Sequence, residues 1–219
     1  MGFGYRLVRK VANLVMHIPR KQYYARYRKA LKNDAPTIIA SDCFGGLVYH
    51  NLGLQFRSPT VNLYFPKEDF LLFVSNLKEY LAAELTETED PSVTFPVGAL
   101  EHNGQKVRIY FMHYPDFPSA KAKWEERTRR VDFTNLCIIQ TLSSATAEDI
   151  RAFDALPYPN KLLITGEDPV GSANVRTHPV YRKADYRPGE ILKYKSLFAL
   201  KRYMDEIDYV GFLNGMSRR

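Results

Sequence analysis

Hydrophobic and polar positions along the chain predict strands separated by helices. Short apolar runs predict buried strands at residues 37–40, 60–64, 136–140 and 161–165. Apolar side chains at helical spacing predict helices at residues 67–85, 119–130, 146–156 and 195–214, and a short helix that ends near Gly53. Strands that alternate with helices form βαβ units, so we expect a mostly parallel sheet.

Two further apolar segments, residues 93–100 and 107–112, lie on either side of Asn103-Gly104. This dipeptide favours a tight turn, so the pair predicts a β-hairpin that makes the sheet a mixed one. The expected fold is a three-layer α/β sandwich with a mostly parallel, mixed sheet. The acidic residues 86–92 are expected to form a loop, and residues 169–189 a long irregular segment that covers the site.

The N-terminal segment has a different pattern. Apolar residues recur at near-helical spacing among basic ones, which predicts a short basic amphipathic helix ending at Pro19; they are Phe3, Leu7, Val11, Leu14 and Val15. A second basic helical piece follows at residues 20–32. We therefore divide the chain into a helical leader, residues 1–33, and a single α/β domain, residues 34–219. The leader either packs on its own domain or docks on an anionic membrane surface.

The distribution of charge changes the interpretation of the basic composition. The 219 residues carry a formal charge of +7, but residues 1–33 hold nine Lys or Arg and no acid. The other residues hold 22 basic and 24 acidic groups, a formal charge of −2. The basic character therefore belongs to the leader, which argues against nucleic acid as the main ligand.

The two cysteines, Cys43 and Cys137, are far apart in a chain without a secretory signal pattern. We expect no disulfide and a reducing, cytoplasmic location, with the leader placing the protein at the inner face of the membrane. No run approaches the roughly 18 apolar residues that span a bilayer. The cysteines form no metal-ligand spacing with the five histidines, and we expect no metal and no cofactor.

The loop Ser41-Asp42-Cys43-Phe44-Gly45-Gly46 follows the first predicted strand and is the main candidate site. In open α/β sheets the ligand binds at the carboxyl ends of the strands. The candidate catalytic residues are Cys43, His113 and Asp42, and the candidate substrate-binding residues are Ser41, Gly45, Gly46, Asn62, Asp116 and Arg127.

These residues allow different mechanisms. Cys43 is a nucleophile if His113 activates it and Asp42 or Asp116 orients the imidazole, an arrangement suited to acyl transfer. The alternative is that Cys43 is a small buried side chain and His113 a structural histidine.

The same loop also suits phosphate binding through the Gly45 and Gly46 amides, with Arg127 or Arg130 as charge partner. In that case the cysteine is not needed, although the arginines also fit an exposed, ion-paired helix face. A non-catalytic scaffold would not require Asp42, Cys43, Asn62 and His113 to converge.

Five motifs appear in the order TIIASDCFGGLVY, SPTVNLYF, DFLLFVSNLKEYL, VRIYFMHYPDFPSAKAKWEERTRRV and FDALPYPNKLLIT. Over about residues 35–214 the chain resembles the bacterial family known as domain of unknown function 1919, whose members are commonly labelled exopolysaccharide biosynthesis proteins. The family usually has Ser-Asn-Asn-Cys-Trp-Gly-Gly in the first loop, so Cys43, Gly45 and Gly46 match, and one amide and the indole do not.

The resemblance implies a transferase of cell-surface polysaccharide biosynthesis that acts on a sugar, a nucleotide-sugar or a lipid-linked glycan by acyl, phosphoryl or glycosyl transfer. The alternative is a non-catalytic, peripheral-membrane binding or scaffolding component of a polysaccharide assembly.

Overall fold

The computed structural model describes residues 3–168 and 171–216, with side chains from residue 8 onward. The helices are α1 (Phe3–Ala30), α2 (Cys43–Leu52), α3 (Lys67–Ser75), α4 (Leu77–Ala82), α5 (Phe117–Thr128), α6 (Ala147–Asp154) and α7 (Tyr209–Asn214). The strands are β1 (Thr37–Ala40), β2 (Thr86–Thr88), β3 (Val97–His102), β4 (Gln105–Tyr110), β5 (Leu136–Leu142), β6 (Lys161–Thr165) and β7 (Val175–Thr177). The 3-10 turns are η1 (Phe133–Asn135), η2 (Pro179–Arg182), η3 (Glu190–Leu192) and η4 (Tyr203–Glu206).

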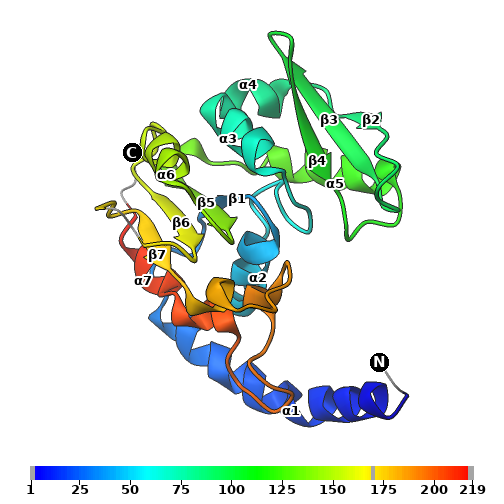
Figure 1. Cartoon of the computed structure of the whole chain (residues 1–219), viewed down its shortest axis with the longest axis vertical. Helices are drawn as coiled ribbons and strands as arrows, with labels where there is room; N and C mark the ends of the chain where they lie inside the picture. Colours follow the sequence, from blue (N-terminus) through cyan, green and yellow to red (C-terminus); the bar gives the residue numbers. More distant parts are fainter. Residues whose placement is uncertain (1–2, 169–170, 217–219) are drawn as a thin grey trace.

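The strands form two sheets. Strands β1, β5, β6 and β7 lie in this order in a parallel sheet, and β2, β3 and β4 form an antiparallel sheet. The two sheets and their helices occupy different parts of the molecule (Figure 1). The predicted hairpin is confirmed as β3 and β4, but it pairs with β2 instead of joining the parallel sheet.

Helices cover both faces of the parallel sheet because alternate strand residues point to opposite sides. On one face, Ile39, Ile138 and Leu163 belong to an apolar cluster with residues of α3, α4, α5, α6 and the antiparallel sheet. On the other face, Ile38, Ile139 and Leu162 belong to a cluster with residues of α2 and α7. The predicted α/β class, with helices on both sides of a parallel sheet and an N-terminal helix, is confirmed.

Several predicted elements are wrong in detail. Residues 60–64 form no strand, because Asn62 has a positive φ of 64° that interrupts the extended backbone; Tyr64 alone makes an isolated bridge, with Tyr110. The helix predicted at residues 67–85 is two helices separated at Asn76. The predicted acidic loop contains β2, which adds to the edge of β3.

Helix α1 continues through Pro19, so the prediction that the helix ends there is wrong. A proline removes one helical hydrogen bond and can kink a helix without ending it. The side chains of Phe3 and Leu7 lie outside the described residues. No helix in the described ranges is long and apolar enough to cross a membrane.

The C-terminal region is less helical than its apolar pattern predicts. Within residues 195–214, only η4 and α7 are helical. The backbone pairs locally instead, because Lys195 N donates to Lys201 O and Tyr203 N donates to Lys193 O. Residues 169–189 are also less irregular than expected, since they contain β7 and η2; Pro169 and Val170 lie outside the described residues.

Candidate functional site

The loop after β1 lies at the carboxyl edge of the parallel sheet, where β1 and β5 end next to each other. Ser41 N donates to Ile139 O at 3.0 Å, and Ser41 Oγ accepts a hydrogen bond from Thr141 N at 3.1 Å. Thr141 Oγ1 donates to Asp42 Oδ2 at 2.6 Å. Ser41 and Asp42 are thus placed by the sheet itself.

Asp42 is a partly exposed carboxyl in a low-dielectric setting. It caps α2, because its Oδ1 accepts a hydrogen bond from Phe44 N at 2.8 Å. Burial raises the pKa of the Asp42 carboxyl, and the hydrogen bonds from Thr141 and Phe44 offset only part of this effect. Asp42 therefore binds a proton more tightly than an ordinary aspartate does, which suits a group that accepts a proton in a reaction.

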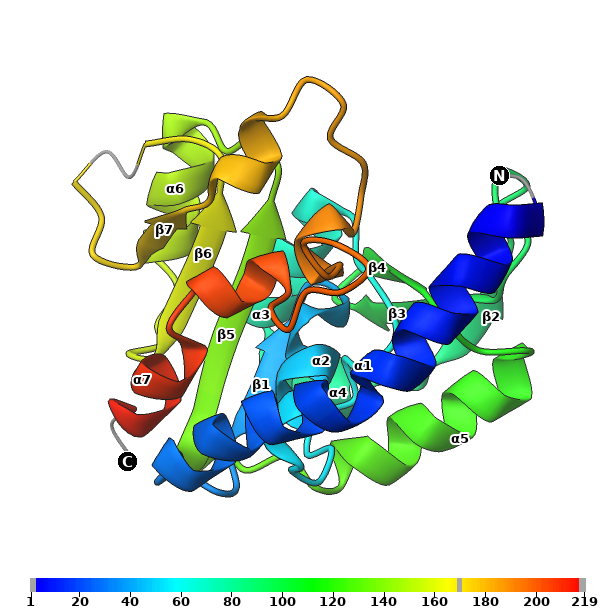
Figure 2. The same ribbon diagram turned by 90° about the horizontal axis from the view of Figure 1, so that it is seen from below.

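Two tyrosines from the C-terminal region lie near Asp42. Burial raises the pKa of Tyr181 and of Tyr186, and the negative charge of Asp42 adds to both shifts. Their ring centroids are 5.2 Å apart. Arg182 donates to Gly166 O after β6 and holds this segment against the sheet edge. The carboxyl ends of β5 and β6 point toward the segment that contains η2 (Figure 2).

Cys43, the first residue of α2, is not an activated thiol in this structure. Its Sγ donates to Leu63 O at 3.8 Å. Burial raises the pKa of the Cys43 thiol to about 12, and the adjacent Asp42 charge contributes to the shift. The thiol is therefore protonated at neutral pH, whereas a nucleophilic cysteine needs a lowered pKa.

His113 does not approach Cys43 through any contact described for the chain, and its side chain is exposed. The neighbouring Tyr114 points inward instead and donates to Val61 O at 3.0 Å. Burial raises the pKa of Tyr114, the charge and the hydrogen bond of Arg127 offset part of this effect, and the nearby Cys43 adds to it. Tyr114 is thus the residue of this segment that lies close to Cys43.

The two glycines allow close packing. A Cβ on Gly45 would lie 2.7 Å from the Ala40 Cβ, and one on Gly46 would lie 3.3 Å from a Val61 methyl group. Gly45 therefore allows α2 to approach β1, which explains it without a bound phosphate. Asn62, next to Gly46, is exposed.

Arg127 and Asp116, the two charged residues predicted to bind substrate, stabilise different segments. Arg127 is buried, donates to the Tyr114 hydroxyl at 2.7 Å, and places its guanidinium 5.1 Å from the Phe56 ring centroid. It therefore fixes Tyr114 near Cys43. Asp116 is exposed and caps α5 by accepting a hydrogen bond from Ser119 N at 2.7 Å. Asp116 thus has a structural role at a helix end.

The structure brings together some of the predicted residues. Ser41 and Asp42 form hydrogen bonds with Thr141, and Cys43 and Arg127 form hydrogen bonds with the backbone of residues 61–63. Within the described residues, no hydrogen bond or ion pair joins His113 or Asp116 to either group. The pattern missed Thr141, Tyr181, Tyr186 and Tyr114. Thr141 could have been predicted as a site residue from the sequence, because it is a polar residue at the end of an apolar strand. In the described ranges, no group of three or more His, Cys, Asp or Glu is placed to hold a metal ion.

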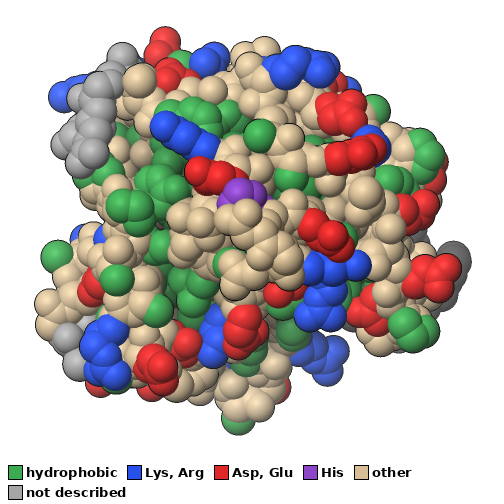
Figure 3. Space-filling view, turned by 90° about the horizontal axis from the view of Figure 1, so that it is seen from above, with side chains coloured by type: hydrophobic (Ala, Val, Ile, Leu, Met, Phe, Trp, Pro, Cys, Tyr) green, Lys and Arg blue, Asp and Glu red, His purple; other side chains and the backbone are tan. Residues whose placement is uncertain are grey.

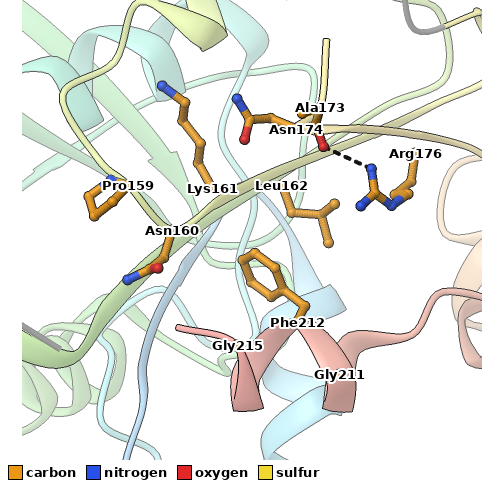
Figure 4. A pocket seen from close by; sticks show the side chains of 10 residues that line it. All are labelled: Pro159, Asn160, Lys161, Leu162, Ala173, Asn174, Arg176, Gly211, Phe212 and Gly215. Atoms are coloured by element: carbon orange, nitrogen blue, oxygen red, sulfur yellow. Dashed lines mark hydrogen bonds between the residues drawn. The ribbon is translucent and has the colours of Figure 1, made fainter. Parts of the chain in front are cut away.

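A cavity of about 250 Å³ lies at the opposite end of the sheet, between the starts of β6 and β7 and helix α7 (Figure 4). Leu162 and Phe212 line it, and the Lys161 side chain points away from Phe212. Lys161 Nζ donates to Leu156 O at 2.6 Å, so it caps the end of α6. Arg176 also lines the cavity, but its Nη1 donates to Ala173 O at 2.9 Å and to Val175 O at 2.8 Å. Both cationic side chains are thus bonded to backbone carbonyls, and the cavity is a weaker candidate than the carboxyl edge.

Comparison with known proteins places the chain in a family. The model of the family described as domain of unknown function (DUF1919) matches residues 14–214, so the chain belongs to this family. A protein of Haemophilus influenzae, described as an uncharacterized protein, is 33% identical over 196 residues, which cover 85% of this chain and 88% of that protein.

Proposed function

We propose that this member of the family is a transferase of cell-surface polysaccharide biosynthesis that acts on a sugar, a nucleotide-sugar or a lipid-linked glycan. The observation that carries the proposal is the Asp42 carboxyl, whose raised pKa and position at the sheet edge suit a general base. The polysaccharide class rests on the motifs that the chain shares with its family. The acid-base role rests on the geometry alone.

In this mechanism Asp42 takes the proton of an acceptor hydroxyl. As the hydroxyl oxygen forms its bond to the transferred group, the bond between that group and the donor breaks, and the leaving group takes the electron pair. The Thr141 hydroxyl donates to Asp42 Oδ2 and orients the carboxylate. Tyr181 and Tyr186, whose rings pack on each other, lie close enough to Asp42 for its charge to raise their pKa values, and they supply aromatic surface at this edge. The proton on Asp42 then returns to solvent.

A base mechanism accounts for the site better than a thiol nucleophile. The Cys43 pKa of about 12 leaves almost no thiolate at neutral pH, and His113 has no described contact with it. A base at Asp42 requires neither thiolate nor imidazole. A phosphate cradle at Gly45 also has less support, because β1 fills the space beside that glycine.

The test begins with a thermal-shift panel of nucleotide-sugars, acyl donors and lipid-linked glycans on the full chain, followed by turnover of any compound that raises the melting temperature. Asp42→Asn should keep the melting shift and lose about 10²–10⁴-fold in kcat, the range of general base catalysis. Asp34→Asn, an exposed aspartate before β1, is the matched control and should retain activity.

Cys43→Ser separates the two mechanisms. It should retain kcat within a small factor if Asp42 is the base, and lose several orders of magnitude if the thiol is the nucleophile. An active Asp42→Asn enzyme, or a panel without a single stabilising compound, would count against the transferase proposal.

A second candidate function is a peripheral-membrane component at the cytoplasmic face, with binding or scaffolding as its role. The specific observation in its favour is a row of exposed apolar side chains on α1. This function does not need a proton acceptor at Asp42. It also does not exclude a transferase that works at the membrane surface.

A further inference from the structure

The N-terminal half of α1 carries an apolar stripe, which consists of Val8, Val11, Leu14, Val15 and Ile18. Their exposed fractions range from 49% for Val8 to 79% for Leu14. Spacings of three and four residues put them on one side of the helix. A helix with such a face exposed to water normally covers it with another surface.

A loop of the C-terminal region packs on the buried side of α1, because Arg20 follows Ile18 by two residues and so lies on the other side of the helix from the stripe. Phe198 and Leu200 in this loop are exposed by 59% and 39%. The buried Arg20 of α1 fixes the loop, because its Nε donates to Ala199 O at 3.1 Å and its Nη2 donates to Leu197 O at 2.8 Å. The loop therefore covers the buried side of α1 and leaves the stripe exposed.

A basic cavity of about 440 Å³ opens between α1, the end of α2 and Tyr194. Its ionisable lining residues other than tyrosine are all basic: His17, Arg20, Lys21, Arg28 and His50. Arg28 Nε donates to Asn51 O at 3.0 Å, so this guanidinium is held at the cavity wall. A polar cavity with basic side chains and no carboxylate favours an anion such as a phosphate group.

The stripe and the cavity are adjacent. His17 follows Leu14 by three residues and Lys21 follows Ile18 by three, so each lies one helical turn from a stripe residue. Both side chains line the cavity. A surface that meets the stripe therefore also reaches the mouth of the cavity.

We propose that the apolar stripe docks on an anionic membrane, and that the basic cavity receives the phosphate of a lipid headgroup. This inference rests on the second candidate function and specifies its surface and ligand. Nine basic groups and no acid in residues 1–33 complement an anionic leaflet. The same charges oppose a second copy of the chain on this face, because like charges would meet.

The formal charge of residues 34–219 also favours α1 as the part of the chain that faces the membrane. Residues 34–219 carry a formal charge of −2. The face shown in Figure 3 has acidic and basic side chains interspersed, with neither sign forming a continuous field. Residues 1–33, with nine basic groups and no acid, therefore account for the net positive charge of the chain, which favours the approach of α1 to an anionic surface.

The test is co-sedimentation of the full chain with vesicles of phosphatidylcholine alone and of phosphatidylcholine with phosphatidylglycerol. Wild type should bind the anionic vesicles more tightly and should bind less tightly as salt increases. A double variant, Leu14→Ser with Ile18→Ser, should lose about tenfold or more of its affinity for anionic vesicles, since about 1.4 kcal/mol of lost apolar burial is a tenfold change. Both side chains are exposed, so the fold should remain intact.

Lys21→Gln and Lys29→Gln test the cavity at equal net charge. Lys21 lines the cavity, whereas Lys29 lies in the last turn of α1 and does not. Lys21→Gln should weaken binding to anionic vesicles about fivefold or more, and Lys29→Gln by less than about twofold, because it lies beyond a Debye length of the stripe. Equal losses would overturn the headgroup cavity and leave only diffuse attraction.

Other outcomes would overturn the membrane surface itself. The membrane surface would be wrong if wild type did not bind anionic vesicles, or if the stripe variant bound them as tightly as wild type does. It would also be wrong if wild type formed a dimer that the stripe variant does not form, or if soluble glycerol 3-phosphate stabilised a protein that does not bind vesicles. None of these measurements involves turnover, so their failure is distinct from a failure of Asp42 as a base.

Discussion

The two halves of helix α1 are both basic, but they have opposite surroundings. Before Pro19, the apolar side chains of the stripe are exposed. After it, Tyr23 and Tyr24 are each only 4% exposed, and Tyr27 stacks on Tyr209 of α7 at 5.8 Å between centroids. The packed interpretation of the leader is therefore correct for the second half. A basic amphipathic pattern does not by itself show which half of the helix packs against the rest of the chain.

What differs is the hydrogen-bonding capacity of the side chains. The Tyr24 hydroxyl donates to Asp205 Oδ2 at 2.8 Å, and the Tyr209 hydroxyl donates to Asp205 Oδ1 at 3.2 Å. Asp205 thus joins α1 and α7 through one buried carboxyl group. The aliphatic residues of the first half have no polar group that could form such a link.

The largest effect should come from deleting the packed half. Removal of residues 1–33 exposes the surface that Tyr23 and Tyr24 cover, at about 1.5–3 kcal/mol for each large side chain. We expect a loss of about 5 kcal/mol or more in the free energy of unfolding, whereas removal of residues 1–18 should cost about 1 kcal/mol. Urea denaturation measures both. Equal losses for the two deletions would mean that the halves do not differ in packing.

A smaller effect should follow from removing a single hydroxyl. Tyr24→Phe leaves Asp205 without one of its donors and should cost about 1.5–3 kcal/mol, as for a hydrogen bond to a charged group. Leu14→Ala removes more atoms from the exposed half, yet it should cost less than about 0.5 kcal/mol. Chemical denaturation gives both values, and a reversed order would contradict the assignment of the packed half.

The strands with uninterrupted apolar runs could be predicted well from the sequence. Residues 161–165 form β6 as expected, and the Asn-Gly turn gives the hairpin, because these signals are local. The separation of two sheets could not be predicted, since strand pairing depends on contacts far apart in the chain. Asn62 argues against the strand predicted at residues 60–64, because asparagine tolerates the positive φ that interrupts an extended backbone.

The candidate site was only partly predictable for the same reason. Ser41 and Asp42 follow a buried strand, and this rule located the sheet edge. Tyr181 and Tyr186 reach Asp42 through the return of the C-terminal chain, which leaves no local pattern. The His113 prediction chose a reactive residue type, but the turn after β4 exposes His113 and buries much of Tyr114. Residue type alone does not show which neighbour points inward.

Pro19→Ala tests the boundary between the halves. Proline within a helix costs about 3 kcal/mol relative to other residues, but α1 is already adapted to it, so alanine should recover only about 1 kcal/mol. We expect a small rise in the melting temperature, about 2–4 °C for each kcal/mol in a chain of this size. Differential scanning calorimetry measures it. A fall would show that the proline is needed to orient the first half.

The smallest effect should be a pH dependence in the packed half. Burial raises the pKa of Asp205 above its ordinary value of 3.8, while hydrogen bonds from Arg202 N, Tyr24 and Tyr209 offset part of the shift. The folded state then holds the proton more tightly than the unfolded state, so this group's contribution to stability falls as pH rises from about the ordinary value through the folded pKa.

Asp205→Asn removes this titration and can keep the contacts. An amide oxygen at the Oδ2 position accepts from Tyr24 and from Arg202 N, and the amide nitrogen donates to the Tyr209 hydroxyl, which then acts as acceptor. The variant should therefore gain stability relative to wild type between pH 4 and pH 7, as measured by urea midpoints, whereas the exposed Asp34→Asn should show no such trend. If the difference between Asp205→Asn and wild type stayed constant with pH, the link between α1 and α7 would rest on hydrogen-bond geometry alone and not on a carboxyl group that binds its proton tightly.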